Sequence, residues 1–363
     1  MSVATLEMKP IAYGRDCKTY LLYDADTKEA AIIDPRFDHV SRYMTELEKL
    51  DLKLKYAFDT HTHADHLSGS DRLRNLTACA IVMSDKTKSK VADYLATDGE
   101  KFKLGGHELT VLHTPGHTPD SQCIFDGARV YTGDTLFIGG AARTDFMGGS
   151  PEQLFESFRK IEALGKDVEV WPGHDYNGHE HSSIAAELEN NDHFKADRET
   201  LIGMHKLKGE LPANMSEILS FNSEAGLPEA RIVKPSDVAA YGTPGKDFTL
   251  LDSRYADEFE AGRIEGAVLI PLPELRDRWS EVEKLPHPIV SVCRSGVRAT
   301  MAMMTARHAD DNDWLLLEGG MQAWMNAGQP MVSDTGKAPD VITSKFATGG
   351  SCAAGGGSCS VVG

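Results

Sequence analysis

Residues 59–66 read Asp-Thr-His-Thr-His-Ala-Asp-His, and this short stretch decides the fold. It places four metal-binding side chains within six residues: His61, His63, Asp65 and His66. The preceding run, Leu54 to Phe58, is short and mostly apolar, as a buried strand would be. A strand end holds the backbone rigid, so alternate side chains that follow it can converge on one point. Because neutral imidazole and carboxylate are preferred ligands of first-row metals, we expect a metal site here.

Three further motifs follow downstream, each after a run that predicts a strand. They are Thr114-Pro-Gly-His117 after residues 109–112, Thr132-Gly-Asp134 after residues 128–131, and Pro172-Gly-His174-Asp-Tyr176 after residues 168–171. Each glycine lets the loop backbone turn tightly beside a ligand. A Gly-His or Gly-Asp pair alone would not indicate a metal site, because any one of the 14 histidines is more often a surface or core residue than a ligand. Four motifs in this order favour one shared metal site over a polar loop with chance histidines.

A second candidate site lies far downstream, at Cys293. The apolar run Pro288 to Val292 predicts a buried strand that ends at this cysteine, and residues 299–308 read as a helix. The loop between them carries Arg294 and Arg298, and its backbone N–H groups would form an anion nest that favours the thiolate. A buried inert cysteine is one alternative. A phosphatase loop of the Cys-x5-Arg type is the other, but here the arginine comes one residue early, and the smaller loop suits sulfur better than phosphate.

The composition bounds the class of protein. A chain of 363 residues with 41% hydrophobic and 26% charged residues predicts two globular domains. A net charge of -17 argues against a nucleic-acid partner, since phosphate backbones demand a basic face. No run of 18 apolar residues predicts a membrane span, and Met1 to Arg15 lacks the apolar core of a signal peptide. Six cysteines in so long a chain do not form a disulfide framework, so a cytoplasmic location is expected.

The pattern of elements predicts the domain organisation. Residues 151–163 and 179–204 read as helices, and the softer stretch 209–229 reads as a bridge between domains. Beyond it, the expected strands 248–251, 268–270, 289–292 and 315–317 alternate with helices, which predicts a doubly wound parallel sheet. The expected boundaries are therefore 1–230, 231–333 and a Gly-rich tail, 334–363. Cys352 and Cys359 in that tail could relay sulfur, close a disulfide, bind a metal or be incidental.

The four histidine and aspartate motifs resemble those of the metallo-β-lactamase superfamily, over roughly the first two-thirds of the chain. The resemblance implies an α/β fold, an αββα sandwich with its metals at the strand ends. In the hydrolase branch, to which glyoxalase II belongs, it implies two zinc ions and a metal-activated water. One zinc would bind His61, His63 and His117, the other Asp65, His66 and His174, with Asp134 bridging them.

The persulfide dioxygenases of the same superfamily retain these motifs, and resemblance to them implies one Fe(II) per chain. Its ligands would be His61, His117 and Asp134, which leave open positions for sulfur and O2. The other motif side chains would orient ligands or water: His63, Asp65, His66 and His174. Ligand types alone leave iron and zinc open.

Three features favour iron. The segment Arg143-Thr-Asp-Phe146 resembles a persulfide-dioxygenase segment, the helical part after Tyr176 is short, and a sulfur-handling domain is fused downstream. The resemblance implies that Arg143 pairs with a carboxylate of glutathione and that Tyr176 lines the same pocket. For both residues a structural role in ion pairing or packing is the alternative.

The downstream region resembles a single rhodanese (sulfurtransferase) domain. The matching motifs are Leu250-Leu-Asp252-Ser-Arg254, Gly262-Arg-Ile-Glu-Gly266-Ala-Val, and Glu318-Gly319-Gly320 with Trp324 and Gly328. The resemblance implies that Cys293 carries a persulfide between donor and acceptor. Arg294 and Arg298 would attract an anionic substrate such as thiosulfate.

Both resemblances together imply a bifunctional enzyme. It would oxidise glutathione persulfide with O2 to sulfite and glutathione, and it would move sulfane sulfur between thiosulfate and glutathione. The alternatives are a glyoxalase II-like zinc thioester hydrolase with an attached sulfurtransferase, and a non-enzymatic sulfur carrier or sensor with a degenerate first site. The direction of sulfur transfer stays open, and a homo-oligomer is among the assemblies that the sequence allows.

Overall fold

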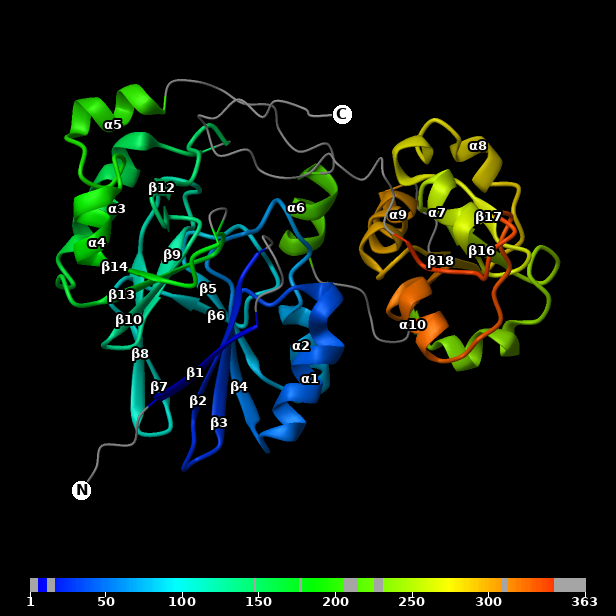
Figure 1. The fold of residues 1–363 in the computed structure, drawn as a ribbon, viewed down its shortest axis with the longest axis horizontal. Coiled ribbons are helices and arrows are strands. Elements are labelled where there is room, and N and C mark those ends of the chain that lie inside the picture. The colour runs from blue at the N-terminus through cyan, green and yellow to red at the C-terminus, as the bar shows by residue number, and fades with distance from the viewer. Residues whose placement is uncertain are drawn as a thin grey trace. The chain divides into compact units, whose positions relative to one another are not determined.

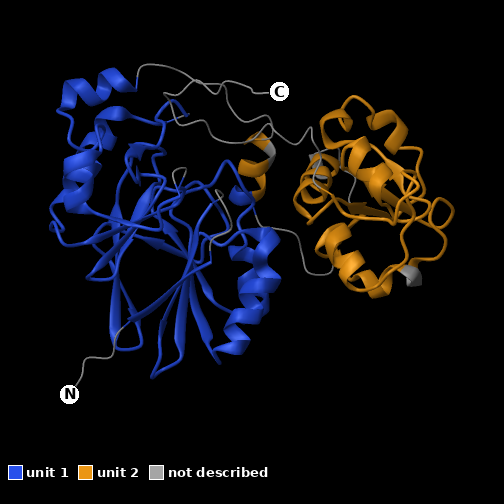
Figure 2. Cartoon of the chain, in the orientation of Figure 1, with its two compact units in different colours: residues 1–211, 222–225, 352–363 blue, residues 212–221, 226–351 orange. Residues whose placement is uncertain are grey.

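The computed structural model describes residues 6–11, 17–146, 148–175, 178–205, 215–224, 231–308 and 313–342. They fall into two compact units (Figure 2). The first comprises the described residues up to 205 together with 222–224, and the second comprises 215–221 and the described residues from 231 onward.

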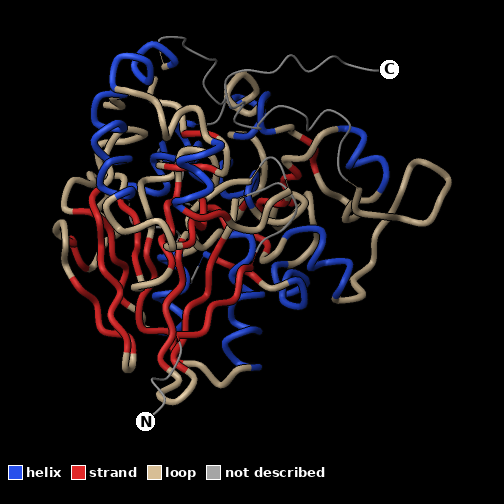
Figure 3. Tube along the Cα trace, turned by 60° about the vertical axis from the view of Figure 1, so that its left-hand side comes forward, coloured by secondary structure: helices blue, strands red, loops and turns tan. Residues whose placement is uncertain are grey.

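Two sheets face each other in the first unit (Figure 3). One has the order β1-β2-β3-β4-β5-β6, with bounds Leu6–Ile11, Thr19–Asp24, Glu29–Ile33, Lys53–Phe58, Ala80–Ser84 and Tyr94–Ala96. The other has the order β14-β13-β10-β9-β8-β7, with bounds Ser182–Ser183, Glu169–Pro172, Arg129–Gly133, Gln122–Phe125, His107–His113 and Lys101–Leu104. A small hairpin joins β11 (Leu136–Phe137) to β12 (Gly140–Ala141). One buried cluster holds Tyr20 and Phe58 from the first sheet and Phe102 and Tyr131 from the second, so the sheets share a core.

Helices cover the outer faces of both sheets (Figure 1). The first sheet packs against α1 (Val40–Lys49) and α2 (Ser70–Thr77), and the second against α3 (Pro151–Glu162), α4 (Ile184–Asn190) and α5 (Arg198–Met204). These layers confirm the expected αββα sandwich. The start of α3 follows from its sequence, because the Ser150 side chain accepts from the Gln153 N–H and Pro151 tolerates the first helical position.

The expectation of one polar helix over 179–204 is wrong. Residues 182–183 form β14, and α4 and α5 follow as separate short helices. Asn191 ends α4 because its buried side chain donates to the carbonyls of Phe137 (3.2 Å) and Gly140 (2.9 Å). Asp197 then caps α5 by accepting from the Thr200 N–H at 2.8 Å. Contacts with residues some fifty positions away thus interrupt a pattern that reads locally as helix.

The stretch 209–229, read as a soft bridge, contains a helix, α6 (Met215–Ser223). The remainder of that stretch lies outside the described residues apart from Glu224. Residues 334–342 were expected to belong to the tail, but they are part of the second unit. The Asp340 N–H donates to the Ala261 carbonyl at 3.1 Å, and Val341 packs against the apolar core. Cys352 and Cys359 lie outside the described residues.

The second unit is built on one parallel sheet, as expected. Its order is β15-β19-β18-β16-β17, with bounds Ile232–Val233, Trp314–Leu317, Ile289–Val292, Thr249–Asp252 and Val268–Leu269. The helices are α7 (Ala256–Ala261), α8 (Trp279–Val282), α9 (Val297–His308) and α10 (Gly320–Asn326). Strands and helices alternate along the chain, which confirms the doubly wound pattern. In the described part of the chain, no helix has the length and apolar character needed to cross a bilayer.

A fully buried ion pair holds the second unit together at the end of β16. Arg254 donates to both carboxylate oxygens of Asp252 and to the carbonyls of Glu258 and Gly262, at 2.7–3.1 Å. Neither side chain is exposed to solvent. The bend after β16 therefore depends on the guanidinium for its hydrogen bonds.

We expect Arg254→Ala to lower the free energy of unfolding of the second unit by about 3–5 kcal/mol, because it leaves the Asp252 carboxylate buried without its partner. Urea unfolding followed by tryptophan fluorescence measures this, since Trp279, Trp314 and Trp324 all lie in this unit. Arg263→Ala is the matched control, because Arg263 pairs with the largely exposed Asp334 and its loss costs about 1 kcal/mol or less. Equal effects of the two substitutions would contradict the expectation.

Candidate functional site

Three of the expected metal-binding side chains meet at one end of the sandwich. His61 lies in the loop after β4, His117 in the loop after β8, and Asp134 directly after β10. One ligand atom from each lies within 4.8 Å of the other two. The two histidines are almost completely buried, and His117 Nε2 is 3.9 Å from Asp134 Oδ2. The structure thus brings together the set that was expected to hold a single ion.

Hydrogen bonds orient both histidines toward this centre. Thr60 donates its one hydroxyl proton to Asp34 (2.9 Å), so its oxygen must accept from Nδ1–H of His61 (3.0 Å). Nδ1–H of His117 donates to the backbone carbonyl of Arg143 at 2.8 Å. In its neutral form each ring therefore leaves Nε2 unprotonated, which is the state that binds a metal.

The charge states also suit a cation. Burial lowers the pKa of His61 to about 3, so the ring is neutral at neutral pH. Burial alone would raise the pKa of Asp134, but the neighbouring His174 lowers it below the ordinary range and keeps the carboxylate ionised. Two imidazoles and one carboxylate fit a divalent first-row ion such as iron or zinc.

The backbone conformation and the packing around Gly133 explain why the expected Thr-Gly-Asp motif contains glycine. Its φ of +48° lies in the left-handed region, and a Cβ at this position would come within 2.3 Å of the Thr60 hydroxyl. Only glycine lets the Asp134 loop pass the hydroxyl that orients His61.

His63 is held differently from His61 and His117. Its Nε2 lies 3.0 Å from Asp34 Oδ1, and its Nδ1 makes no hydrogen bond with the described residues. Burial raises the pKa of Asp34 to about 6. The adjoining carboxylate of Asp59 accepts from the hydroxyls of Ser68 and Ser70. The Asp34 and Asp59 pair supports the loop rather than lining the centre, while the free Nδ1 of His63 is available as a further donor.

His174 lies between the three-residue centre and a second cluster. Its Nδ1 is 2.7 Å from Asp134 Oδ1, and its Nε2 is 3.0 Å from Asp65 Oδ2. Burial alone would lower the pKa of His174, but Asp134 and its other neighbours raise it well above the ordinary value. Without a bound ion, the ring is therefore protonated and joins two carboxylates.

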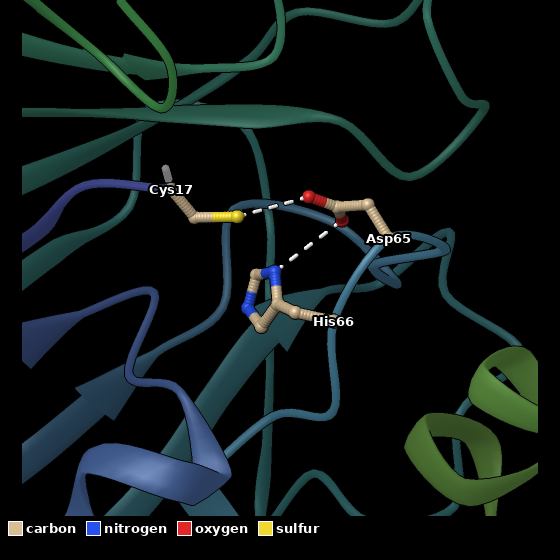
Figure 4. Close-up of side chains that lie close together, drawn as sticks. All are labelled: Cys17, Asp65 and His66. Carbon is tan, nitrogen blue, oxygen red and sulfur yellow. Dashed lines mark hydrogen bonds and ion pairs between the residues drawn. The ribbon is translucent and has the colours of Figure 1, made fainter. Parts of the chain in front are cut away.

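The second cluster consists of Cys17, Asp65 and His66, whose side chains point toward one another (Figure 4). Cys17 Sγ is 3.0 Å from Asp65 Oδ2, and His66 Nδ1 is 3.3 Å from Asp65 Oδ1. Two of the three were expected near the centre, but Cys17 was not singled out from the sequence. It precedes β2 without any local motif, so only the folded chain reveals it.

Asn222 of α6 is another residue that sequence reasoning missed. Its buried side-chain amide donates to the carbonyls of His63 (2.9 Å) and His66 (2.8 Å) and accepts from the Ser68 N–H (2.8 Å). It fixes the loop that carries the first motif. No signal near residue 222 indicates this, whereas Asp34 directly follows β3 and fits the strand-end rule that located the motifs.

Of the two expected substrate-binding residues, Arg143 and Tyr176, only Arg143 lies within the described part of the chain. The guanidinium of Arg143 is bound to Asp145 (2.7 Å) and lies over the ring of Phe146 at 4.8 Å. The Phe146 ring in turn contacts the His117 ring, with centroids 5.0 Å apart. Arg143 is thus near the centre but already paired. Tyr176 lies outside the described residues.

Cys293 follows β18 in the second unit and is almost completely buried. The Gly296 N–H donates to its sulfur at 3.1 Å, as expected for a loop whose amides face the thiol. The Met321 N–H holds the Cys293 carbonyl at 2.8 Å. Gly320 permits this approach, because a Cβ at this position would lie 2.3 Å from that carbonyl oxygen.

The two loop arginines differ in their partners. Arg298 makes two hydrogen bonds to the buried carboxylate of Glu258, at 2.6 and 2.7 Å. The Nε of Arg294 is buried and finds no hydrogen-bond partner in the part of the chain that the structure describes. The expected pair of anion-attracting arginines therefore includes one whose charge is largely balanced.

Comparison with known proteins places both units. Residues 12–174 match the model of the metallo-beta-lactamase superfamily, and residues 239–327 match that of the rhodanese-like domain. The mitochondrial persulfide dioxygenase ETHE1 of Bos taurus is 35% identical over 214 residues, which cover 58% of this chain and 84% of that protein. A hydroxyacylglutathione hydrolase of Methylococcus capsulatus is 30% identical over 244 residues, covering 66% and 92%. The crystal structure of ETHE1 from Myxococcus xanthus superposes with a TM-score of 0.58 at 34% identity, covering 60% of this chain and 98% of that one.

We expect Thr60→Val to weaken metal binding by about 10–100-fold, because it removes the acceptor that orients His61 while nearly preserving side-chain volume. Competition with a chelator of known affinity measures this. Thr45→Val is the control, since the Thr45 hydroxyl donates to the Ser41 carbonyl on the exposed face of α1, away from the candidate site. Unchanged metal affinity in Thr60→Val would show that the hydroxyl does not position the ligand.

Proposed function

Since the chain belongs to the metallo-beta-lactamase superfamily, has persulfide dioxygenases among its relatives and carries a rhodanese-like domain, we propose that it is a bifunctional enzyme of sulfur metabolism. Its first domain, residues 1–230, oxidises glutathione persulfide with O2 and water to glutathione and sulfite. Its second, residues 231–333, moves sulfane sulfur between thiosulfate and glutathione. The convergence of His61, His117 and Asp134 on one point is the observation that carries the proposal.

In the first domain, these three side chains would hold one Fe(II). When bound, the ion supplies the redox chemistry that joins oxygen to the persulfide sulfur. His174 bonds Asp134 and thereby fixes the carboxylate, and His63, Asp65 and His66 shape the buried wall beside it. Burial excludes bulk water and strengthens each of these interactions.

Glutathione would bind at the edge of this centre. Arg143, beside the His117 ring through Phe146, would pair with a glutathione carboxylate. Its backbone carbonyl already orients His117, so the same residue would link substrate binding to ligand geometry. Tyr176 is assigned to the same pocket from the sequence alone.

In the second domain, the thiolate of Cys293 would attack the outer sulfur of thiosulfate. The S–S bond breaks, sulfite leaves with the electron pair, and Cys293 carries a persulfide. The thiolate of glutathione then takes the outer sulfur, which forms glutathione persulfide and restores the Cys293 thiolate. The Gly296 N–H stabilises negative charge on sulfur, and Arg294 attracts the incoming anion.

We assign thiosulfate consumption as the working direction. Oxidation by O2 is effectively irreversible, so the first domain would drain the persulfide that the second one makes.

The cysteines Cys17, Cys79, Cys123 and Cys293 are free thiols, which fits a reducing compartment such as the cytoplasm.

A second candidate function is thioester hydrolysis with two zinc ions, as in glyoxalase II. The free Nδ1 of His63 and the hydroxyacylglutathione hydrolase among the relatives favour it. Analysis of the metal in the purified protein separates the two: about one iron per chain supports the dioxygenase, and two zinc ions support the hydrolase.

We expect His117→Ala to lose bound iron and to lower O2 uptake with glutathione persulfide by roughly 100-fold or more, because two ligands hold the ion poorly. An oxygen electrode and a sulfite assay measure the activity, and elemental analysis measures the iron. His179→Ala, at an exposed position of the same unit, should keep both. Hydrolysis of S-lactoylglutathione at a comparable rate without O2 uptake would sink the proposal.

We expect Cys293→Ser to abolish sulfur transfer from thiosulfate to glutathione, because a hydroxyl cannot hold a persulfide. O2 uptake with supplied glutathione persulfide should stay nearly normal, whereas O2 uptake with thiosulfate and glutathione should disappear. Cys79→Ala, a buried thiol outside both sites, is the control for both assays. Equal thiosulfate-driven O2 uptake by wild type and Cys293→Ser would show that the second domain does not feed the first, and would favour the thiosulfate-forming direction.

A further inference from the structure

We propose that His205, at the end of α5, is a positioning residue for the candidate metal ligand His117. Its ring Nδ1 lies 3.2 Å from the hydroxyl of Thr144, a residue that is almost completely buried. Thr144 directly follows Arg143, whose backbone carbonyl accepts the Nδ1–H of His117 at 2.8 Å. His205 therefore acts on His117 through this segment rather than by direct contact. This role rests on the proposed function of His117 as a metal ligand.

A single peptide group connects the two hydrogen bonds. The carbonyl carbon of Arg143 is bonded to the backbone nitrogen of Thr144, and the peptide group is planar. A hydrogen bond to the Thr144 side chain holds the Cα at one end of this plane. It thus limits how far the carbonyl oxygen can move away from His117. The direction of that oxygen in turn sets the orientation of the His117 ring, as partners of metal-binding histidines commonly do.

The end of α5 is itself held in place, so His205 can serve as an anchor. Leu201 of α5 is fully buried in a cluster with Phe158 of α3. The His205 N–H donates to the Leu201 carbonyl at 3.3 Å and helps to close the helix. The His193 ring packs edge-on against the His205 ring, with centroids 5.4 Å apart. The imidazole therefore has a fixed position from which it can hold Thr144.

The His205 ring is neutral when it makes this contact. Burial and the neighbouring His193 lower the pKa of His205 to about 4, which leaves the ring uncharged at neutral pH. The contact with Thr144 is the one hydrogen bond that the ring makes in the part of the chain that the structure describes. Removing it would leave the buried Thr144 hydroxyl without this partner. The two residues are 61 positions apart, so no local motif indicates the contact.

Two substitutions at His205 separate a hydrogen-bonding role from a packing role. Leucine keeps a branched side chain without a polar atom, whereas asparagine is smaller but keeps a polar atom near the position of Nδ1. We expect His205→Leu to weaken Fe(II) binding by about 3–10-fold, below the roughly 10–100-fold typical for loss of a ligand's direct partner, and His205→Asn to stay within about twofold of the wild type. Competition between the metal-free, full-length protein and a chelator of known Fe(II) affinity, without oxygen, measures both.

Thr144→Val removes the same hydrogen bond from the other side and nearly preserves side-chain volume. It should weaken Fe(II) binding about as much as His205→Leu does. The double variant should bind no more weakly than either single variant, because all three lack one shared hydrogen bond. Unchanged Fe(II) affinity in His205→Leu, equal losses in His205→Leu and His205→Asn, or losses that multiply in the double variant would each overturn the role assigned to His205.

Failure of the proposed function gives a different result. If His117→Ala loses Fe(II) while His205→Leu keeps the wild-type affinity, only the role of His205 is refuted. If His117→Ala binds Fe(II) as tightly as the wild type, His117 is not a ligand and the proposed metal centre is refuted as well.

Discussion

The buried carboxylate of Asp34 is the group on which the arrangement of the candidate metal-binding residues depends. It accepts hydrogen bonds from the backbone and hydroxyl of Thr60, at 2.7 and 2.9 Å, and contacts His63 Nε2 at 3.0 Å. Through Thr60 it sets the tautomer of His61. Through its contact with Nε2 it also fixes the orientation of the His63 ring in the same loop. A carboxylate removed from water is costly, and these partners offset that cost. The loop can therefore hold several buried imidazoles close together.

Both units place their candidate site residues by the same geometric rule. In the first, His61 and Asp134 follow strands β4 and β10, and in the second, Cys293 follows strand β18. A strand end is rigid, and the loop after it exposes backbone amides and side chains in a fixed direction. Close backbone packing then completes each site, at Gly133 against Thr60 and at Gly320 against the Cys293 carbonyl.

The sequence predicted what depends on local pattern. The strands before each motif, the helix that begins at Pro151 and the parallel sheet of the second unit could be read from periodicity and capping signals. The sequence could not reveal partners that only the fold brings together. Cys17 and His174 are 157 positions apart, and Asn222 reaches His63 over 159 positions. The break of the expected 179–204 helix has the same cause, since Asn191 bonds carbonyls near residue 140. Long-range hydrogen bonds outweighed local propensity at each of these places.

The pairing of Arg298 with Glu258 has a consequence for how long an anion stays on the cysteine loop. Two uncompensated guanidiniums would hold an anion strongly. Because the Glu258 carboxylate balances one guanidinium, the loop attracts an anion mainly through Arg294 and its backbone amides. A weaker field lowers the affinity of the loop for an anion. The buried glutamate thus favours release of a bound anion over its tight retention.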